Sequence, residues 1–289
     1  MEIIRSLQEM QLKSLELIRQ NKQIGFVATM GFFHEGHTNL MKRAKQENDI
    51  VVTSIFVNPL QFGPSEDFEQ YPRDEQQDTT VAEQVGVDYL FLPEIQDMYP
   101  TPLIISMNIE DRADVLCGRS RPGHFEGVIT VLSKLFHIIQ PSKTYFGMKD
   151  AQQVAVVDAL IKDLNFPIEL IPVSTTREKD GLAKSSRNVY LTNKERQEAP
   201  QLYGALNKGR KLVVDGETNT DIIVKEVMDV INNHTSGRID YVELLSYPQL
   251  EPVSVVNRPV VLAVAVHFNR ARLIDNLLFD EYGNLIKQI

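Results

Sequence analysis

The fold of this chain is best predicted from the stretch Ile24-Gly25-Phe26-Val27-Ala28-Thr29-Met30-Gly31-Phe32-Phe33-His34-Glu35-Gly36-His37-Thr38-Asn39-Leu40. Residues 24–30 form an apolar run that is short enough for one buried strand. The run breaks at Gly31, and an amphipathic helical pattern begins after the second histidine. The stretch therefore predicts a strand, a glycine turn, two histidines and the N-terminus of a helix.

The glycine turn and the two histidines suit the binding of a triphosphate. The first turn of a helix carries unpaired N–H groups and the positive end of the helix dipole, so anions bind there. Gly31 and Gly36 let the backbone approach phosphates, and His34 and His37 supply donors for charge on a leaving pyrophosphate. The alternative is that both histidines are surface-loop residues. The strand before them and the helix after them favour phosphate binding.

Composition narrows the class of protein. The chain has 289 residues, 43% of them hydrophobic and 24% charged, which is ordinary for a globular protein. The formal net charge of −9 argues against nucleic acid or an anionic membrane as a partner. Cys117 is the only cysteine, so no intrachain disulfide can form, and an inert thiol is favoured over a nucleophile. No apolar run approaches the ~18 residues of a membrane span, and the N-terminus lacks a signal pattern, so a cytoplasmic location is predicted.

A second strand at residues 50–57 follows the first helix, and this strand–helix–strand order indicates a parallel sheet. Ligands bind beyond the carboxyl ends of such strands. The polar loop 58–72 starts at that edge, where Asn58 and Gln61 could hydrogen-bond a small polar substrate. The alternative is a rigid surface loop.

Further elements are predicted along the first part of the chain. They are helices at 6–20, 74–85, 128–139 and 148–164, and strands at 88–92, 102–109, 143–147 and 168–173. Arg121 and His124 stand at a helix start, where they can attract anions. Lys149 follows the glycine turn at Gly147 and can reach a phosphate, and Asp150 can accept ribose hydroxyls or support a metal.

The last polar stretch, 175–188, contains lysine, arginine and serine donors that suit closure over a triphosphate, although a solvated linker is the alternative. Helices at 193–213 and 217–233 follow, and then strands at 238–246, 260–267 and 271–278. This order is an α+β pattern. We therefore predict two domains, a catalytic α/β domain at 1–180 and a smaller C-terminal α+β domain at 181–289.

Motif absences limit the chemistry. The sequence has no G-x-x-x-x-G-K-[ST] loop, no G-x-G-x-x-G, no zinc spacing and no G-x-S-x-G elbow. The remaining site suits attack by a bound substrate on the α-phosphate of ATP, with the protein supplying positioning and charge stabilisation. Two alternatives stay open. One is a nucleotidyltransferase that joins a nucleoside monophosphate to a phosphorylated acceptor, and the other is a nucleotide sensor without turnover.

Several motifs together resemble the pantoate–β-alanine ligase (pantothenate synthetase) family, over nearly the whole chain and in the same order. The likeness is carried by Thr29-Met30-Gly31 with His34-Glu35-Gly36-His37, Phe56–Gly63, Tyr71-Pro72-Arg73, Arg121–Phe125, Tyr145-Phe146-Gly147 with Lys149–Gln153, Ser185–Asn188, and the terminal Arg272–Asn276. The H-x-G-H element alone is shared with the wider nucleotidyltransferase group.

The resemblance implies a Rossmann-like ATP-binding domain with a smaller lid domain, in a homodimer. It implies that pantoate and Mg²⁺-ATP form pantoyl adenylate and pyrophosphate, and that β-alanine then gives pantothenate and AMP. The catalytic residues implied are His34, His37, Lys149, Ser185, Ser186 and Arg187. ATP would also contact Met30, Gly31, Gly36, Gly147, Met148, Asp150, Thr176 and Lys184. Gln61 and Gln153 would hold pantoate, with Asn58, Tyr71, Arg121 and His124 in support around the pantoate and β-alanine site.

The chain departs from the family pattern at a few positions. Ala28 stands where proline is usual, the pair Phe32-Phe33 replaces smaller residues, and Met148 replaces a glutamate. Glu126 stands where a basic residue is common, which leaves the charge near the substrate in question. None of these departures removes a residue assigned to chemistry, and no protein ligand of the metal is identified.

Overall fold

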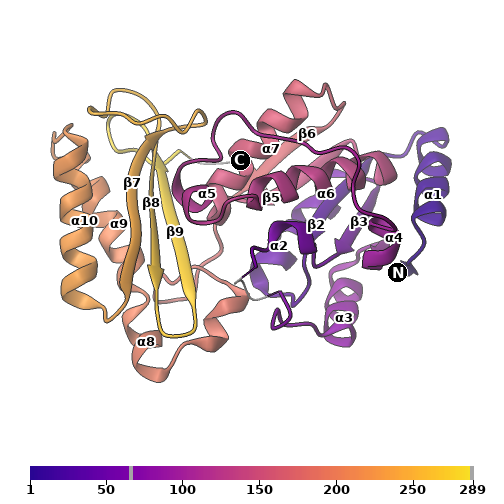
Figure 1. The fold of residues 1–289 in the computed structure, drawn as a ribbon, viewed down its shortest axis with the longest axis horizontal. Coiled ribbons are helices and arrows are strands. Elements are labelled where there is room, and N and C mark those ends of the chain that lie inside the picture. The colour runs from indigo at the N-terminus through magenta and orange to yellow at the C-terminus, as the bar shows by residue number, and fades with distance from the viewer. Residues whose placement is uncertain (65–67, 287–289) are drawn as a thin grey trace. The chain divides into compact units, whose positions relative to one another are not determined.

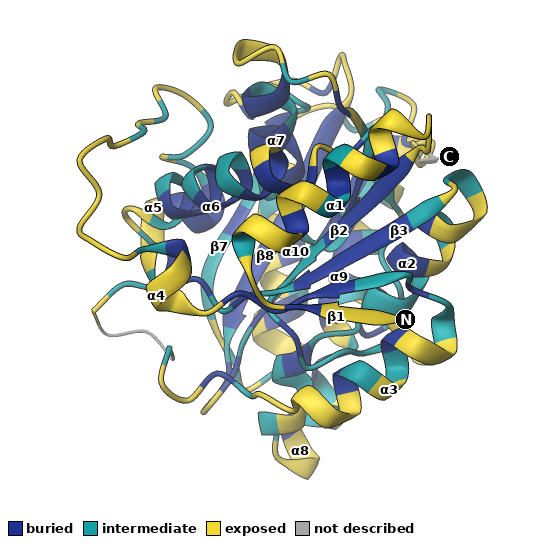
Figure 2. Ribbon diagram, turned by 90° about the vertical axis from the view of Figure 1, so that its right-hand side faces the viewer, coloured by how far each residue is buried: buried dark blue, intermediate teal, exposed yellow. Residues whose placement is uncertain are grey.

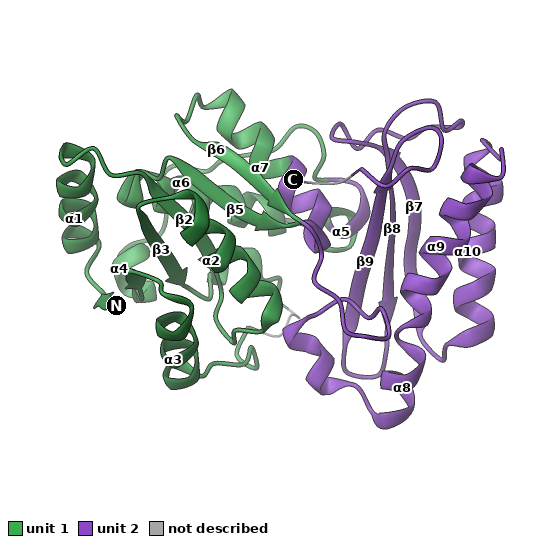
Figure 3. Cartoon of the chain, turned by 180° about the vertical axis from the view of Figure 1, so that it is seen from behind, with its two compact units in different colours: residues 1–113, 118–147, 156–173 green, residues 114–117, 148–155, 174–289 purple. Residues whose placement is uncertain are grey.

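The computed structural model describes residues 1–64 and 68–286. Residues 65–67 of the predicted substrate loop therefore lie outside the described residues. The chain divides into two compact units, coloured separately in Figure 3. The first comprises residues 1–113, 118–147 and 156–173, and the second comprises 114–117, 148–155 and 174–289.

A parallel sheet forms the centre of the first unit (Figure 1). Within the described residues it has six strands in the order β1-β4-β3-β2-β5-β6, and every neighbouring pair is parallel. The strands are β1 (Glu2–Ile4), β2 (Ile24–Thr29), β3 (Ile50–Ile55), β4 (Tyr89–Phe91), β5 (Lys143–Gly147) and β6 (Glu169–Val173). From β2 the chain moves outward through β3 and β4, and it then returns to the other side of β2 as β5. The carboxyl ends of β2 and β5 thus form a topological switch point, the usual ligand site of such sheets.

Helices connect these strands. They are α1 (Leu7–Arg19), α2 (Glu35–Glu47), α3 (Glu75–Val85), α4 (Ile95–Met98), α5 (Leu116–Ser120), α6 (His124–Ile139) and α7 (Ala151–Asp163), with short 3₁₀ turns η1 (Pro59–Gln61) and η2 (Met148–Asp150). Ser6 and Asp74 cap α1 and α3, because their side-chain oxygens accept N–H groups of the first turn. In Figure 2 the strands β2 and β3 are mostly dark blue, whereas α1 has an exposed face in yellow. The apolar composition of the two strands follows from burial on both faces.

An antiparallel sheet forms the core of the second unit, in the order β7-β8-β9. From residue 186 onward, the second unit contains η3 (Ser186–Tyr190), α8 (Asn193–Glu198), α9 (Gln201–Val214), α10 (Thr220–His234), β7 (Arg238–Ser246), β8 (Val260–His267) and β9 (Arg272–Phe279). The apolar face of the sheet packs with α9 and α10 in one buried cluster that contains Leu206, Val227 and Leu262. Among the described residues, no helix has the length and apolar character needed to cross a membrane.

The structure corrects some predicted elements. The predicted helix at 193–213 is two helices, because Pro200 lacks the N–H group that would continue the helical hydrogen-bond pattern. The predicted strand at 102–109 is wrong. Within the described chain this segment pairs with no strand, and Ile104 and Ile105 are 98% and 80% exposed. Helix α6 begins at His124, earlier than the predicted 128. The strand β1 and the short helices α4 and α5 were not predicted.

Candidate active site

The loop after β2 is held in an unusual backbone conformation. Gly31 and Phe32 both have positive φ angles, +84° and +54°. The buried carboxylate of Asp78, on α3, accepts the backbone N–H groups of Phe32 and Phe33 at 2.7 and 2.6 Å. Burial raises the pKa of Asp78, although these two N–H bonds oppose the rise. Asp78 thus fixes the two residues that precede the histidine motif.

His34 and His37 cap the N-terminus of α2 reciprocally. The Nδ1 atom of His34 accepts the N–H of Gly36 at 3.1 Å, and Nδ1 of His37 accepts the N–H of His34 at 3.3 Å. The two rings stack with centroids 4.1 Å apart. A ring nitrogen that accepts an N–H bond is unprotonated, so in each neutral imidazole the proton lies on Nε2. A side chain at Gly36 would meet the His34 ring at 2.7 Å, which explains the glycine between the histidines.

Asn58 organises the loop after β3. It is 1% exposed, and its Nδ2 atom donates to Oε1 of Gln61 at 3.2 Å and to the carbonyl of Gly127 at 3.0 Å. The hydroxyl of Tyr99 donates to Oδ1 of Asn58 at 3.0 Å. Nε2 of Gln61 lies 3.1 Å from the Sδ atom of Met30, which is only a weak acceptor. The Gln61 amide is therefore oriented beside the end of β2.

Arg121 and His124 both hydrogen-bond the backbone carbonyl of Gln61. The carbonyl of Gln61 accepts Nδ1–H of His124 at 2.8 Å and an Nη2–H of Arg121 at 3.3 Å. Nη1 of Arg121 donates to Nε2 of His124 at 3.1 Å. His124 consequently has the opposite tautomer to the two histidines of α2. Tyr71, 6% exposed, packs edge-on against Phe62 of the same loop, with ring centroids 6.0 Å apart.

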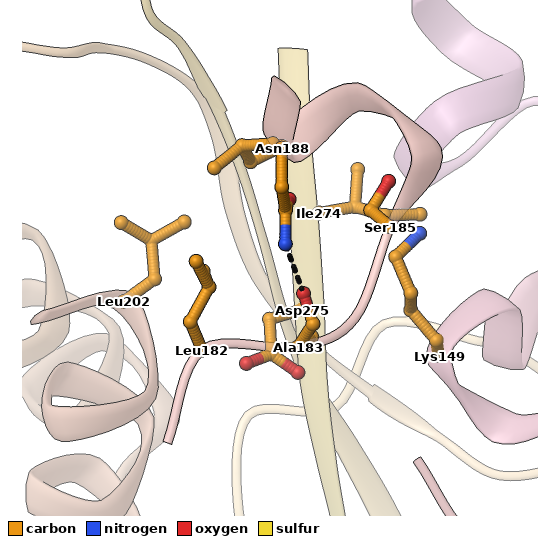
Figure 4. A pocket seen from close by; sticks show the side chains of 9 residues that line it. Lys149, Leu182, Ala183, Ser185, Asn188, Leu202, Ile274 and Asp275 are labelled. Carbon is orange, nitrogen blue, oxygen red and sulfur yellow. Dashed lines mark hydrogen bonds between the residues drawn. The ribbon is translucent and has the colours of Figure 1, made fainter. Parts of the chain in front are cut away.

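In the second unit, a pocket brings together Lys149 and the later part of the predicted closing loop 175–188 (Figure 4). Its empty volume is about 240 Å³, with open solvent at its mouth included. The lining residues are Lys149, Leu182, Ala183, Ser185, Asn188, Leu202, Leu273, Ile274 and Asp275. Nδ2 of Asn188 donates to the carbonyl of Ala183 at 3.1 Å, the bond drawn as a dashed line. The Nζ atom of Lys149 lies 3.8 Å from the carboxylate of Asp150.

The segment 176–184 forms a hairpin that leads into the serine pair. The backbone N–H of Lys184 donates to the carbonyl of Thr176 at 2.9 Å, and its Nζ atom pairs with Glu178 at 3.2 Å. Ser185 then caps η3, because its Oγ atom accepts the N–H of Arg187 at 3.3 Å. This local cap orients the first turn of η3, which also contains Ser186.

The predicted site residues fall into two groups. Within the first unit lie Met30, Gly31, His34, Gly36, His37, Asn58, Gln61, Tyr71, Arg121, His124 and Gly147, and within the second lie Met148, Lys149, Asp150, Gln153, Thr176, Lys184, Ser185, Ser186 and Arg187. The described residues contain no group of three or more His, Cys, Asp or Glu side chains arranged to hold a metal ion.

Two polar residues that fix the backbone beside predicted site residues were not assigned a role from the sequence. Asp78 stands four residues before Ala82 on the buried face of α3. A carboxylate on the buried face of a helix needs a hydrogen-bond partner, and this position in the sequence could have indicated its role. Asn276 stands in strand β9 beside Asp275, and its Nδ2 atom donates to the carbonyls of Met148 and Lys149, both at 2.9 Å.

Comparisons with known proteins agree over almost the whole chain. The pantoate–β-alanine ligase family model matches residues 2–278. A pantothenate synthetase of Geobacillus thermodenitrificans (strain NG80-2) is 59% identical over 278 residues, with 96% of each chain covered. The crystal structure of a pantothenate synthetase from Thermus thermophilus has a TM-score of 0.90 at 40% identity, and covers 96% of this chain and 99% of that one. A pantoate–β-alanine ligase of Francisella tularensis, complexed with β-γ ATP and β-alanine, has a TM-score of 0.78 at 34% identity, and the match covers 96% of this chain and 97% of that one. This chain belongs to the pantoate–β-alanine ligase family.

Proposed function

We propose that this ligase joins pantoate to β-alanine through a pantoyl-adenylate intermediate. In the first step a carboxylate oxygen of pantoate attacks the α-phosphorus of ATP, and the bond to the bridging oxygen breaks to release pyrophosphate. In the second step the amine of β-alanine attacks the acyl carbon and loses a proton, and AMP leaves with the electron pair of the acyl–oxygen bond. The observation that carries the proposal is the pair of Nε2–H donors at the N-terminus of α2.

His34 and His37 act as fixed hydrogen-bond donors in this mechanism. Their Nδ1 atoms accept backbone N–H groups, so each neutral ring carries its proton on Nε2. Negative charge builds on the phosphate oxygens as pyrophosphate leaves, and preoriented donors stabilise that charge without reorganisation. The positive end of the α2 dipole adds to the same effect.

The side chains that the loop after β3 offers to the acceptor, Asn58, Gln61 and Tyr71, are neutral. Asn58 holds Gln61 by hydrogen bonds, and the Arg121 guanidinium is engaged by the Gln61 carbonyl and by His124. A neutral amide suits the hydroxyls and carboxylate of pantoate. It suits a phosphorylated acceptor less well, since phosphate recognition favours Arg and Lys clusters. This difference favours the ligase mechanism over the nucleotidyltransferase alternative.

Lys149, Ser185, Ser186 and Arg187 are proposed to contact the phosphates of ATP. Lysine supplies a point charge, arginine a planar fork and serine a hydroxyl donor. Gly147, Met148, Asp150, Thr176 and Lys184 complete the proposed ATP contacts, and Gln153 is proposed to share pantoate with Gln61. Mg²⁺ commonly binds one or two carboxylates together with substrate phosphates, and Asp150 beside Lys149 is a donor of this kind. The ion would neutralise charge on the phosphates.

Three broader predictions accompany this mechanism. The division into domains at 1–180 and 181–289, the homodimer and the cytoplasmic location all come from the sequence and its family resemblance. Each of them stays a prediction. The exposed isoleucines of segment 102–109 support the homodimer, because an apolar surface of this kind favours burial against a partner.

Pantoate-dependent exchange of labelled pyrophosphate into ATP, with Mg²⁺ and without β-alanine, tests the mechanism. Exchange that requires pantoate is the expected result, because reversible adenylate formation returns label to ATP. Addition of β-alanine should then produce AMP and pantothenate in equal amounts. A chain that binds ATP and makes pantothenate with no pantoate-dependent exchange would contradict a free reversible adenylation step. Binding of ATP with no product in either assay would support the sensor alternative.

A further inference from the structure

We propose that the dipeptide Asp275-Asn276 of β9 is a common anchor for the two ATP-directed segments of the second unit. Asn276 positions the turn that contains Lys149, and Asp275 positions the hairpin that leads to Ser185. The proposal rests on the proposed function of Lys149 and of the serine segment in ATP binding. The sequence singled out this dipeptide only as part of a family-like ending, without a role.

Asn276 forms the first half of the anchor. It is 7% exposed, and its Nδ2 atom donates to the carbonyls of Met148 and Lys149, each at 2.9 Å. Two bonds from one amide to consecutive carbonyls fix the peptide plane between them and the backbone dihedrals on either side. The side chain of Lys149 departs from this fixed backbone. Its ammonium therefore samples a smaller volume than it would from an untethered turn.

Asp275 forms the second half. Its carboxylate, 4% exposed, binds the guanidinium of Arg177 at 2.6 and 2.9 Å in a bidentate pair. The Arg177 guanidinium also donates to the carbonyl of Gly181 at 3.1 Å and lies 3.8 Å from the ring centroid of Tyr203. Arg177 thus closes the hairpin across its own loop and ties it to β9. Buried bidentate pairs impose geometry strictly, because losing one partner leaves an uncompensated charge.

The position of the dipeptide in β9 explains how one strand contacts both segments. Adjacent residues of a strand direct their side chains to opposite faces, so Asp275 and Asn276 reach different neighbours. Strand β9 is also an edge strand of its sheet in the described chain, and its outer side is accessible to other segments. Lys149, Ser185 and Asp275 line the same pocket. A single rigid strand therefore sets the spacing between the lysine and the serine segment.

A double-mutant cycle tests the anchor. Asn276→Leu keeps the approximate volume and removes both donated bonds, and Lys149→Ala removes the ammonium. Lys149→Ala should lower kcat/KM for ATP in the exchange assay by ~10²–10³-fold. Asn276→Leu should lower it by about 10- to 100-fold in the wild-type background, the scale of a misplaced group. In the Lys149→Ala background the same change should cost less than about threefold, because its effect acts through the lysine.

Thr220→Val is the matched control. Thr220 is also buried in the second unit, and its hydroxyl donates to the carbonyl of Val253 at 2.7 Å, so its loss removes a comparable bond. Thr220→Val should lower the midpoint of urea unfolding by about as much as Asn276→Leu does. It should leave kcat/KM for ATP unchanged. Asn276→Asp is the second variant. A protonated carboxyl can still donate one bond to a carbonyl, so the activity of this variant should fall as the pH rises through the pKa of the new carboxyl.

The outcomes separate the anchor from the function on which it rests. If Lys149→Ala retains wild-type exchange, both the lysine role and the anchor are overturned. If Lys149→Ala is impaired and Asn276→Leu costs the same factor in both backgrounds, or costs nothing, only the anchor is overturned. The role of Asp275 is tested by a second double-mutant cycle that combines Asp275→Asn with Ser186→Ala. The losses in kcat/KM for ATP should be less than additive, and additive losses would contradict the proposal.

Discussion

The tautomers of His34 and His37 are set by the backbone N–H groups that their Nδ1 atoms accept. Each Nδ1 atom accepts a main-chain bond, of 3.1 Å for His34 and 3.3 Å for His37. A neutral ring with its proton on Nε2 donates a hydrogen bond without introducing a permanent charge. In the proposed mechanism, such a donor stabilises the charge that develops during adenylation more than it stabilises the ground state.

Replacement of His37 by alanine therefore removes a donor and also leaves the His34 N–H without its side-chain acceptor. We expect kcat for pantoate-dependent exchange to fall by ~10²–10³-fold, the scale for one lost charge-stabilising donor. Steady-state exchange rates at saturating ATP and pantoate measure the effect. His234→Ala is the control, since His234 is exposed on α10. Full activity of His37→Ala would show that the histidine has no such role.

The contribution of Asp78 to the free energy of unfolding depends on pH. Burial raises the pKa of Asp78, so its folded-state value lies above the unfolded-state value. The corresponding stabilisation is complete below the unfolded-state pKa and is lost as the pH rises through the folded-state pKa. Asparagine keeps one acceptor for the two N–H groups and does not titrate.

We expect Asp78→Asn to cost about 1–3 kcal/mol of unfolding free energy at acidic pH, because one N–H group loses its acceptor. The difference from wild type should narrow as the pH rises towards neutral. Urea unfolding across a pH series measures both effects, with the exposed Asp229→Asn as control. A difference that widens with pH would contradict the assigned direction of the pKa shift.

At the scale of elements, the contact between α6 and η1 determines where Gln61 lies. An added Cβ at Gly127 would lie 2.3 Å from the carbonyl oxygen of Leu60 and 2.7 Å from the backbone nitrogen of Gln61. The Gly127 carbonyl also accepts Nδ2 of Asn58. Glycine at this position lets the helix approach the turn closely enough for that bond.

Gly127→Ala should therefore displace the turn and raise KM for pantoate by up to about tenfold, the worth of one hydrogen-bonding group. Overpacking should also lower stability by about 1–3 kcal/mol. Gly204→Ala is the matched control, because its Cβ would meet only Gln201 at an ordinary 3.6 Å. It should stabilise α9 slightly and leave KM unchanged. An unchanged KM in Gly127→Ala would mean that the turn does not position Gln61 for pantoate.

At the scale of the whole molecule, the segment 102–109 carries apolar side chains that the described part of a single chain leaves exposed. Ile104 and Ile105 are 98% and 80% exposed, and Leu103 is 44% exposed. A chain that forms a homodimer through this segment should become monomeric when both isoleucines are replaced by lysine. Sedimentation velocity over a range of concentrations measures the change, and Ile222→Lys, on the exposed face of α10, is the control. A wild-type chain that is already monomeric would contradict the predicted homodimer.

Local sequence patterns predicted most elements correctly, since a strand such as β2 or a helix such as α2 is specified by its own periodicity and caps. They failed where the outcome depends on distant partners. The segment 102–109 has the composition of a strand, but strand formation requires a neighbour to accept its backbone hydrogen bonds. Strand β1 is too short to be recognised alone and exists because β4 pairs with it.

The sequence by itself determined the family, the parallel sheet and the chemical types at the site, because motifs and periodicity are local properties. It did not reveal that Asp78 holds the histidine loop or that Asn276 holds the turn of Lys149. Those contacts join residues 45 and 127 positions apart, and no periodicity extends over such separations. The tertiary structure also decided the tautomers of His34 and His124, since a ring nitrogen is protonated or not according to the neighbour it meets.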